Sequence, residues 1–339
     1  MFMIDLQWIE HHWKRLTAEL AQVPHAVLFH GPRGVGKLAL ASRLAALLLC
    51  EKPAANLPCG GCDGCRWFVA GNHPDFRLVQ PESLDQDSDP EEESEVAMED
   101  ERSARKAKPS TEIKVAQVRA LADFLYVGSH RGARRVALIH PAEAMNPNAA
   151  NALLKGLEEP PANAMFLLVS HAPARLLPTV RSRCVRVAVT VPDRRVALDW
   201  LKAKGIADPG QWLAFAGGAP LLAEELAAGE RSAELVQLLE ALGQANFAAM
   251  GTNTREGLEL LAEVLQKRAY DGAFVALGAG AKYGTSAVPK SAVSASSWLE
   301  FARNMGRNRA MARRPLNPGL FAAELVASYQ TLLEPNAKG

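Results

Sequence analysis

A glycine-rich loop between an apolar run and a leucine-rich segment constrains the fold of this chain more than any other feature. Residues 31–38 read GPRGVGKL, follow the apolar run 26–30 and lead into 38–50, where leucines recur at helical spacing. The loop fits the phosphate-binding pattern G-x-x-x-x-G-K-[ST] at all but its last position. A strand, such a loop and a helix in this order are typical of a parallel α/β sheet, in which loop N–H groups face an anion. The candidate nucleotide-binding residues are Gly31, Gly34, Gly36 and Lys37.

Other positions lack the groups that ATP hydrolysis needs. Leu38 stands where a Ser or Thr hydroxyl would bind Mg²⁺, and it offers no oxygen to a hard cation. The apolar run 135–140 ends in His140 and Pro141, where an active site needs a carboxylate. Imidazole is a poor Mg²⁺ ligand, and Glu143 further on would have to meet near-ideal octahedral geometry. We therefore expect no intrinsic ATPase activity, and both ATP with Mg²⁺ and an empty turn stay open for the loop.

Strand-like and helix-like segments alternate over the first half of the chain. Apolar runs at 135–140, 165–170 and 184–191 predict strands, and AANALLKGLE at 149–158, closed by two prolines, predicts a helix between the first two. This order predicts a parallel sheet covered by helices on both faces. Beyond Pro192 the strand signal disappears, and Ala/Leu-rich amphipathic stretches predict an all-helical second half.

A block of acidic residues interrupts the α/β part. Residues 82–101 hold 11 acidic and no basic side chains, so the rest of the chain has 38 basic residues against 26 acidic ones. The segment 82–110 has almost no large apolar residues, and we predict that it is a disordered excursion from a basic body. The simplest interpretation is a solvated loop without a partner.

The composition also limits where such a chain can function. No stretch approaches 18 uninterrupted apolar residues, which excludes a membrane-spanning protein. The N-terminal residues MFMIDLQWIEHHWKRL place acids and histidines where a secretory signal needs a basic stretch followed by an apolar run. We therefore expect a cytoplasmic protein with no membrane partner, and 339 residues predict two or three domains.

Four of the five cysteines lie between residues 50 and 65, in the spacing C-x8-C-x2-C-x2-C. In a reducing compartment such a cluster favours a metal over disulfides, and four thiolates can close one tetrahedral Zn²⁺ shell, with Gly60, Gly61 and Gly64 in the tight turns. Free buried cysteines and a redox C-x-x-C are the alternatives, but CGGCDGC is too polar for a core and lacks the βαβ context of redox motifs. The fifth, Cys184, is predicted to be a small buried residue. The candidate ligands of a structural zinc are Cys50, Cys59, Cys62 and Cys65.

Several motifs occur together in the order found in one known family. They are HAVLFHGPRGVGK at 25–37, the cysteine spacing, NALLKGLEEPP at 151–161 and SRC at 182–184. Together they resemble the clamp-loader subunits of bacterial DNA polymerase III, which belong to the AAA+ ATPases. The resemblance implies a RecA-like AAA+ α/β domain with a zinc module, followed by a small helical lid and a helical oligomerisation (collar) domain. The expected bounds are 1–190 for the first domain, with the module at 50–65 and the acidic insertion at 82–110, then 191–235 and 236–339.

Departures from the pattern of that family indicate which kind of subunit this chain resembles. The motor subunits, gamma and tau, keep a Ser or Thr after the loop lysine and an Asp-Glu pair where this chain has His140 and Pro141. The sequence IHPAEAMN is instead similar to the non-hydrolysing stator of the ring, and GGAPLL around Pro220 lacks the second-sensor arginine of the family. The resemblance therefore implies a stator that completes a ring with gamma/tau and delta subunits and helps to load the sliding clamp on primed DNA.

The arginine of SRC carries the sharpest functional expectation. In the family it crosses the subunit boundary and meets the γ-phosphate bound by the neighbour, so the resemblance implies a catalytic role in trans for Arg183. The residues alone would make it one of several arginines, with Arg181 and Arg186, on a solvated edge. Ser170 occupies the position of the family's first sensor, although a site without a metal-bound phosphate gives it nothing to sense.

Two other functions stay as alternatives. An autonomous AAA+ motor, similar to gamma or tau, would hydrolyse ATP itself, but Leu38, His140 and Pro141 argue against it. A small-molecule P-loop kinase would need neither the cysteine cluster nor the long helical second half. In that half, FARNMGRNRAMARR at 301–314 holds five arginines, which we interpret as the basic outer face of a packed helical domain rather than a nucleic-acid contact.

Overall fold

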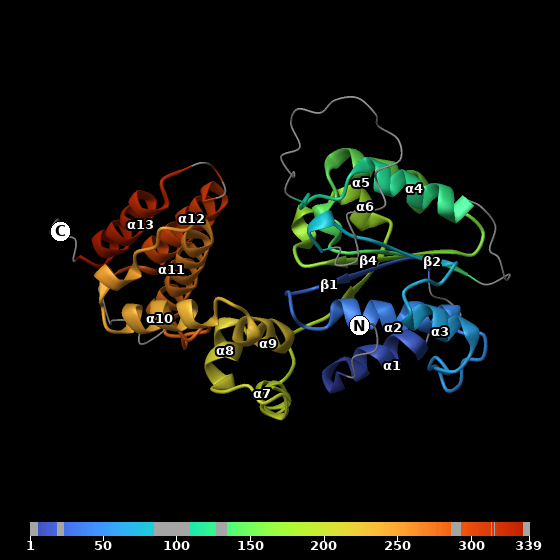
Figure 1. The fold of residues 1–339 in the computed structure, drawn as a ribbon, viewed down its shortest axis with the longest axis horizontal. Coiled ribbons are helices and arrows are strands. Elements are labelled where there is room, and N and C mark those ends of the chain that lie inside the picture. The colour runs from blue at the N-terminus through green and yellow to red at the C-terminus, as the bar shows by residue number, and fades with distance from the viewer. Residues whose placement is uncertain are drawn as a thin grey trace, which may run out of the picture. The chain divides into compact units, whose positions relative to one another are not determined.

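The computed structural model describes residues 6–18, 24–84, 109–126, 134–285, 293–312, 314 and 316–334 (Figure 1). The chain divides into two compact units, Met1–Val191, which contains a sheet, and Pro192–Gly339, whose described elements are helical. None of the helices in the described ranges combines the length and apolar character needed to cross a membrane. The further division expected at 235 stays a prediction, and that position lies inside helix α10 (Ser232–Gly243).

A five-stranded parallel sheet forms the centre of the first unit, which confirms the expected fold class. Its strands, in spatial order, are β2 (Phe76–Val79), β3 (Arg135–Ile139), β4 (Ala164–Ser170), β1 (Ala26–His30) and β5 (Val185–Ala188). The three central strands are the continuous apolar runs of the sequence, and they are buried along almost their whole length because helices cover both faces. His30 pairs with Ser170 at the end of β1 and β4, so the carboxyl ends of these strands meet at one edge.

The two edge strands, β2 and β5, follow the sequence pattern less closely than the central strands. β2 gives no clear signal in the sequence, because this strand is only four residues long and carries the exposed Arg77 in its middle. β5 is shorter than the apolar run 184–191 that predicted it, and most of its side chains are exposed. An exposed edge with charged side chains is the usual way to end a sheet without inviting another strand.

Helices cover both faces of the sheet. α1 (Glu10–Ala18), α2 (Lys37–Leu49) and α3 (Asp63–Val69) lie on one face, and α4 (Val115–Tyr126) and α5 (Pro147–Glu158) lie on the other (Figure 1). α5 begins where its sequence predicts, because the Asn146 side chain accepts the N–H of Ala149 at 2.8 Å and Pro147 occupies the first turn. Short turns complete this unit: η1 (Gln7–Ile9), η3 (Glu82–Leu84), η4 (Ala142–Ala144), η5 (Pro173–Arg175) and the one-and-a-half-turn helix α6 (Pro178–Ser182).

The acidic excursion begins and ends at an ordered neck. The Ser83 N–H donates to the Ser110 carbonyl at 3.0 Å, and the Ser110 N–H donates to Glu82 Oε2, also at 3.0 Å. Glu82 in addition forms an ion pair with Lys114 at the start of α4. The predicted disorder over 82–110 is therefore wrong at both ends, where backbone and carboxylate hydrogen bonds fix the chain, and the remainder, 85–108, lies outside the described residues.

The second unit is built around one long helix. Its helices are α7 (Arg194–Ala203), α8 (Pro209–Phe215), α9 (Pro220–Ala228), α10 (Ser232–Gly243), η6 (Phe247–Met250), α11 (Arg255–Ala276), α12 (Ala295–Met311) and α13 (Pro318–Leu333). Trp298 of α12 packs directly on α11, where a Cβ on Gly272 would lie 2.4 Å from the indole ring. Tyr329 of α13 contacts the same indole, and a single hydrophobic cluster extends from α7 to α13. The predicted all-helical second half is confirmed for the described residues.

Candidate functional site

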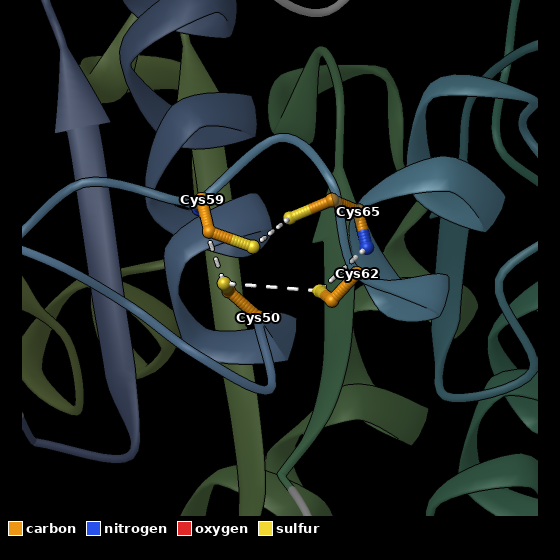
Figure 2. A group of neighbouring side chains, drawn as sticks. All are labelled: Cys50, Cys59, Cys62 and Cys65. Atoms are coloured by element: carbon orange, nitrogen blue, oxygen red, sulfur yellow. Dashed lines mark hydrogen bonds between the residues drawn. The ribbon is translucent and has the colours of Figure 1, made fainter.

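The four cysteines predicted to bind a metal converge on one point (Figure 2). Cys50 follows the end of α2, Cys59 lies in the loop, Cys62 is the N-cap of α3 and Cys65 lies in its first turn. The Sγ atoms of Cys50 and Cys62 are 3.9 Å apart, those of Cys59 and Cys65 are 4.0 Å apart, and all four lie within 4.8 Å of one another.

The cluster fits a tetrahedral metal ion. A regular Zn²⁺ shell with bonds of about 2.3 Å places its sulfurs about 3.8 Å apart, close to the two shortest separations observed. Backbone N–H groups also point at the sulfurs, with Cys59 N 3.2 Å from Cys50 Sγ and Cys65 N 3.4 Å from Cys62 Sγ. Such donors stabilise thiolates, which are the metal-binding form of cysteine. The described residues contain no other group of this kind.

The four thiols do not ionise alike. The N–H groups of Gly61 and Cys62 lower the pKa of the exposed Cys59 to about 6, whereas burial raises the pKa of Cys65 to about 12. The Cys59 thiol is therefore the easier of the two to deprotonate, and a bound cation would have to displace the proton of Cys65. The arrangement can hold a metal as four thiolates, but it leaves no ligand position open for a substrate.

Glycines close this module, although not all three that the sequence suggested are needed. A Cβ on Gly64 would lie 2.6 Å from the Leu49 carbonyl oxygen, so only glycine lets α3 approach the end of α2. Gly60 has a φ of +72°, which favours glycine, whereas Gly61 has open space around it and no such backbone requirement.

The glycine-rich loop connects β1 to α2, as predicted, and its glycines are fixed by their surroundings. Gly31 has a φ of +146°, and a Cβ there would lie 2.0 Å from the Val189 carbonyl oxygen. A Cβ on Gly36, whose φ is +93°, would lie 2.7 Å from Leu6 Cδ1. Gly34 also has a positive φ, of +77°. The loop is thus held between the segment after β5 and the start of the described chain.

Lys37 points into its own loop. Its side chain is buried, and Nζ donates to the Gly31 carbonyl at 2.8 Å and to the carbonyl of Pro32. Burial lowers the pKa of Lys37 to about 8, an effect that the nearby Glu143 carboxylate opposes. The ammonium group is therefore engaged by backbone oxygens of the loop in this structure.

Two histidines and a carboxylate occupy the carboxyl ends of β3 and β4. The rings of His140 and His171 stand edge to face at 5.3 Å, and Glu143 Oε1 accepts the backbone N–H groups of His171 and Ala172 at 2.8 and 3.1 Å. Burial lowers the pKa of His140 to about 4 and of His171 to about 3, so both rings are neutral at physiological pH. Glu143 is therefore tied to the backbone beyond β4.

Several buried polar atoms in this cluster have no hydrogen-bond partner. They are His140 Nδ1, Glu143 Oε2, Ser170 Oγ and His171 Nδ1. Sequence reasoning had singled out three of these residues but missed His171, whose only signal is its position directly after the buried run 165–170. Neutral imidazoles beside a buried lysine offer little to Mg²⁺, which prefers several oxygen ligands.

Arg183 lies at the end of α6, on the side of the sheet that α5 also covers. Its Nη2 forms an ion pair with Glu158 Oε1 at 2.5 Å, and its Nη1 donates to the Thr179 carbonyl at 2.9 Å. About a third of the side chain, 34%, stays exposed. The neighbouring Cys184 is buried, as predicted, and burial raises its pKa to about 11.

Comparisons with known proteins identify the family of this chain. A family model described as "DNA polymerase III, delta subunit" matches residues 9–192, more than half of the chain. A DNA polymerase III subunit delta' of Pseudomonas aeruginosa is 40% identical over 71% of this chain and 68% of its own. A DNA polymerase III subunit tau of Salmonella typhimurium is 35% identical over 51% of this chain and 23% of its own. Among solved structures, a gamma subunit-related protein of Thermotoga maritima matches with a TM-score of 0.47 and 17% identity over 95% of this chain and 99% of that one.

The matched span coincides with the unit that contains the parallel sheet, the glycine-rich loop and the cysteine cluster. The family model is described as a delta subunit, and the Pseudomonas aeruginosa relative carries the name subunit delta'. The chain belongs to the delta-prime subunits of the DNA polymerase III clamp loader.

Proposed function

We propose that this chain is the non-hydrolysing stator of a clamp loader and that it donates Arg183 to the ATP site of a neighbouring subunit. In this proposal it completes a ring with gamma/tau and delta subunits, and the ring loads the sliding clamp on primed DNA. The observation that carries the proposal is the contrast between the two ends of the unit. At its own nucleotide edge the two histidines are buried and neutral, whereas Arg183 is a partly exposed cation.

The lack of intrinsic hydrolysis follows from charge. Phosphoryl transfer needs metal ions held by oxygen ligands and a cation aimed at the developing negative charge. Leu38 supplies no hydroxyl, His140 stays neutral with its pKa of about 4, and one carboxylate oxygen of Glu143, Oε1, is engaged by two backbone N–H groups. Lys37 donates to the loop carbonyls and not outwards, which further weakens any grip on a nucleotide.

The role of Arg183 is supported by what surrounds it. A guanidinium has five N–H donors, and the described contacts use one on Glu158 and one on the Thr179 carbonyl. The rest are available to a phosphate, for which the planar guanidinium is well suited. An arginine supplied in trans typically raises turnover by about 10³ to 10⁵.

The alternative, a motor subunit that hydrolyses its own ATP, is favoured by the intact backbone of the loop and by Lys37. Reconstituted complexes carrying Arg183→Ala or Lys37→Ala distinguish the two proposals, with Arg186→Ala on the exposed edge strand as the matched control. We expect Arg183→Ala to assemble normally but to lower DNA-stimulated ATP turnover and clamp loading, because one ATP site loses its arginine. Lys37→Ala and Arg186→Ala should change neither rate. Loss of turnover in Lys37→Ala, or hydrolysis by the isolated chain, would establish the motor alternative instead.

We further propose that the cysteine cluster holds one structural Zn²⁺. Zinc favours tetrahedral thiolate sites, and the separations of the sulfur atoms suit its bond length. The cytoplasm, which keeps thiols reduced, is the compartment in which such a site and a replication complex would work.

A further inference from the structure

We propose that Glu158 is a positioning residue for Arg183: its carboxylate holds the guanidinium in the orientation in which the remaining N–H donors can meet a phosphate of the neighbouring subunit. This inference rests on the proposed function of Arg183. It assigns a role to the last residue of α5, which lies in the run NALLKGLEEPP.

The pair has two points of attachment, which fix direction as well as distance. Arg183 Nη2 meets Glu158 Oε1 at 2.5 Å, and Nη1 donates to the Thr179 carbonyl at 2.9 Å. A guanidinium held through both terminal nitrogens cannot turn about its own axis without breaking one contact. The contacts described for this side chain leave Nε and one N–H on each terminal nitrogen without a partner, so the group is oriented but not saturated.

Both ends of the pair are attached to the packed core. Leu157, next to Glu158, is 2% exposed, and Val180, whose carbonyl accepts the N–H of Arg183 at 3.2 Å, is fully buried in the same hydrophobic cluster. The carboxylate and the arginine backbone therefore share one rigid support formed by α5 and α6. A site built on packed helices is more precise than one on a free loop.

Stability alone does not account for the contact. The two side chains are 34% and 50% exposed, and exposed ion pairs contribute little to folding. Pre-orientation offers a clearer benefit, because an arginine side chain that is already ordered loses less freedom when it engages its target. Glu159, the next residue, is exposed and has no described ion pair, so it provides a control with the same charge on the same turn.

The test is a double-mutant cycle in the reconstituted complex with clamp and primed DNA. Glu158→Gln, Arg183→Ala and the double variant are compared with Glu159→Gln and with Glu158→Asp, which keeps the charge. We expect Glu158→Gln to lower kcat for ATP by up to about fivefold, with KM for ATP unchanged. This is the rate ratio expected if the full interaction energy of an exposed ion pair is lost from the transition state. Glu158→Asp should recover part of this loss, and Glu159→Gln should behave as wild type. In the Arg183→Ala background, Glu158→Gln should have no further effect, and the thermal unfolding midpoint of the isolated chain should stay constant.

The outcomes separate this inference from the proposed function. If Arg183→Ala leaves turnover unchanged, the proposed function fails, and the positioning role fails with it. If Arg183→Ala lowers turnover while Glu158→Gln does not, the proposed function stands and the positioning role is wrong. A rise in kcat in Glu158→Gln would mean that the carboxylate restrains the arginine instead. An equal loss with and without Arg183 would mean that Glu158 acts by another route.

Discussion

Replacement of Cys62 by serine tests the metal centre without disturbing the helix that carries it. Cys62 is both a candidate ligand and the N-cap of α3, where its sulfur accepts the N–H of Cys65 at 3.4 Å. Serine is a preferred N-cap residue, so Cys62→Ser removes a thiolate but keeps the cap. Cys62→Ala removes both, and the difference between the two variants isolates the cap, which is worth about 1 kcal/mol.

The magnitude follows from how the module is attached. Binding of Zn²⁺ by a full set of ligands contributes on the order of 10 kcal/mol, far more than the cap. The loop from Cys50 to Cys62 carries three of the four sulfurs, whereas α3 keeps a separate anchor, because Phe68 is buried and its ring centroid lies 4.9 Å from that of Phe76. We therefore expect Cys62→Ser to free the loop while leaving α3 on the sheet.

Metal analysis and hydrogen exchange measure this directly. The wild-type chain should contain one zinc, and Cys62→Ser should lose it to a mild chelator, with faster exchange confined to 50–65. Cys184→Ser is the control, because this cysteine is buried away from the cluster and should leave the zinc content unchanged. Zinc near zero in wild-type protein never exposed to chelator would refute the assignment, and so would a Cys62→Ser variant that keeps its metal and its protection.

Two further predictions concern stability. In the first, residues 86–107 are replaced by a short Gly/Ser linker, and the hydrogen bonds between Glu82 and Ser110 are retained. The free energy of unfolding should stay unchanged or rise by about 1 kcal/mol, because the shorter loop costs less entropy to close. A clear fall in the urea midpoint would show that the segment packs on the body. The second concerns His140 and His171, whose pKa values in the folded chain are about 4 and 3 against an ordinary 6.5. Below pH 6.5 the unfolded chain therefore binds more protons than the folded chain. The free energy of unfolding should fall as the pH is lowered from 6.5 towards 4. The loss at pH 5 should be roughly 1–2 kcal/mol for each histidine, and unfolding curves of His171→Gln should show a shallower decline if the reasoning is right.

The parts of the fold that the sequence predicted are those in which one physical signal dominates. The three central strands are apolar runs because both faces are covered, and α5 is bounded by a capping asparagine and by prolines. β2 escaped detection because an edge strand needs only a short, half-polar segment. The ordered neck of the acidic excursion escaped it as well, since its hydrogen bonds join residues more than twenty positions apart.

In the candidate sites, too, local spacing could be predicted from the sequence, whereas contacts between residues of different elements could not. The spacing of the cysteines was enough to predict their convergence, because thiolate ligands recur at short intervals when they share one ion. The partner of Arg183 could not be predicted, because Glu158 belongs to another helix and only the packing of α5 on α6 brings the two together. His171 was missed for the same reason: its neighbour His140 follows a different strand.

The glycine-rich loop illustrates why a phosphate-binding pattern does not by itself establish nucleotide binding. Gly31 is required because a Cβ at this position would lie 2.0 Å from the Val189 carbonyl oxygen. Gly36 is required because a Cβ there would clash with the side chain of Leu6. Neither requirement involves a phosphate. Lys37 likewise has a structural use, because its ammonium group donates to two carbonyl oxygens of the loop. Without Lys37 these carbonyls would lose that donor. The loop can therefore keep its glycines and its lysine as parts of the fold, so the proposal that this chain does not hydrolyse ATP rests on Leu38 and His140 and not on the loop.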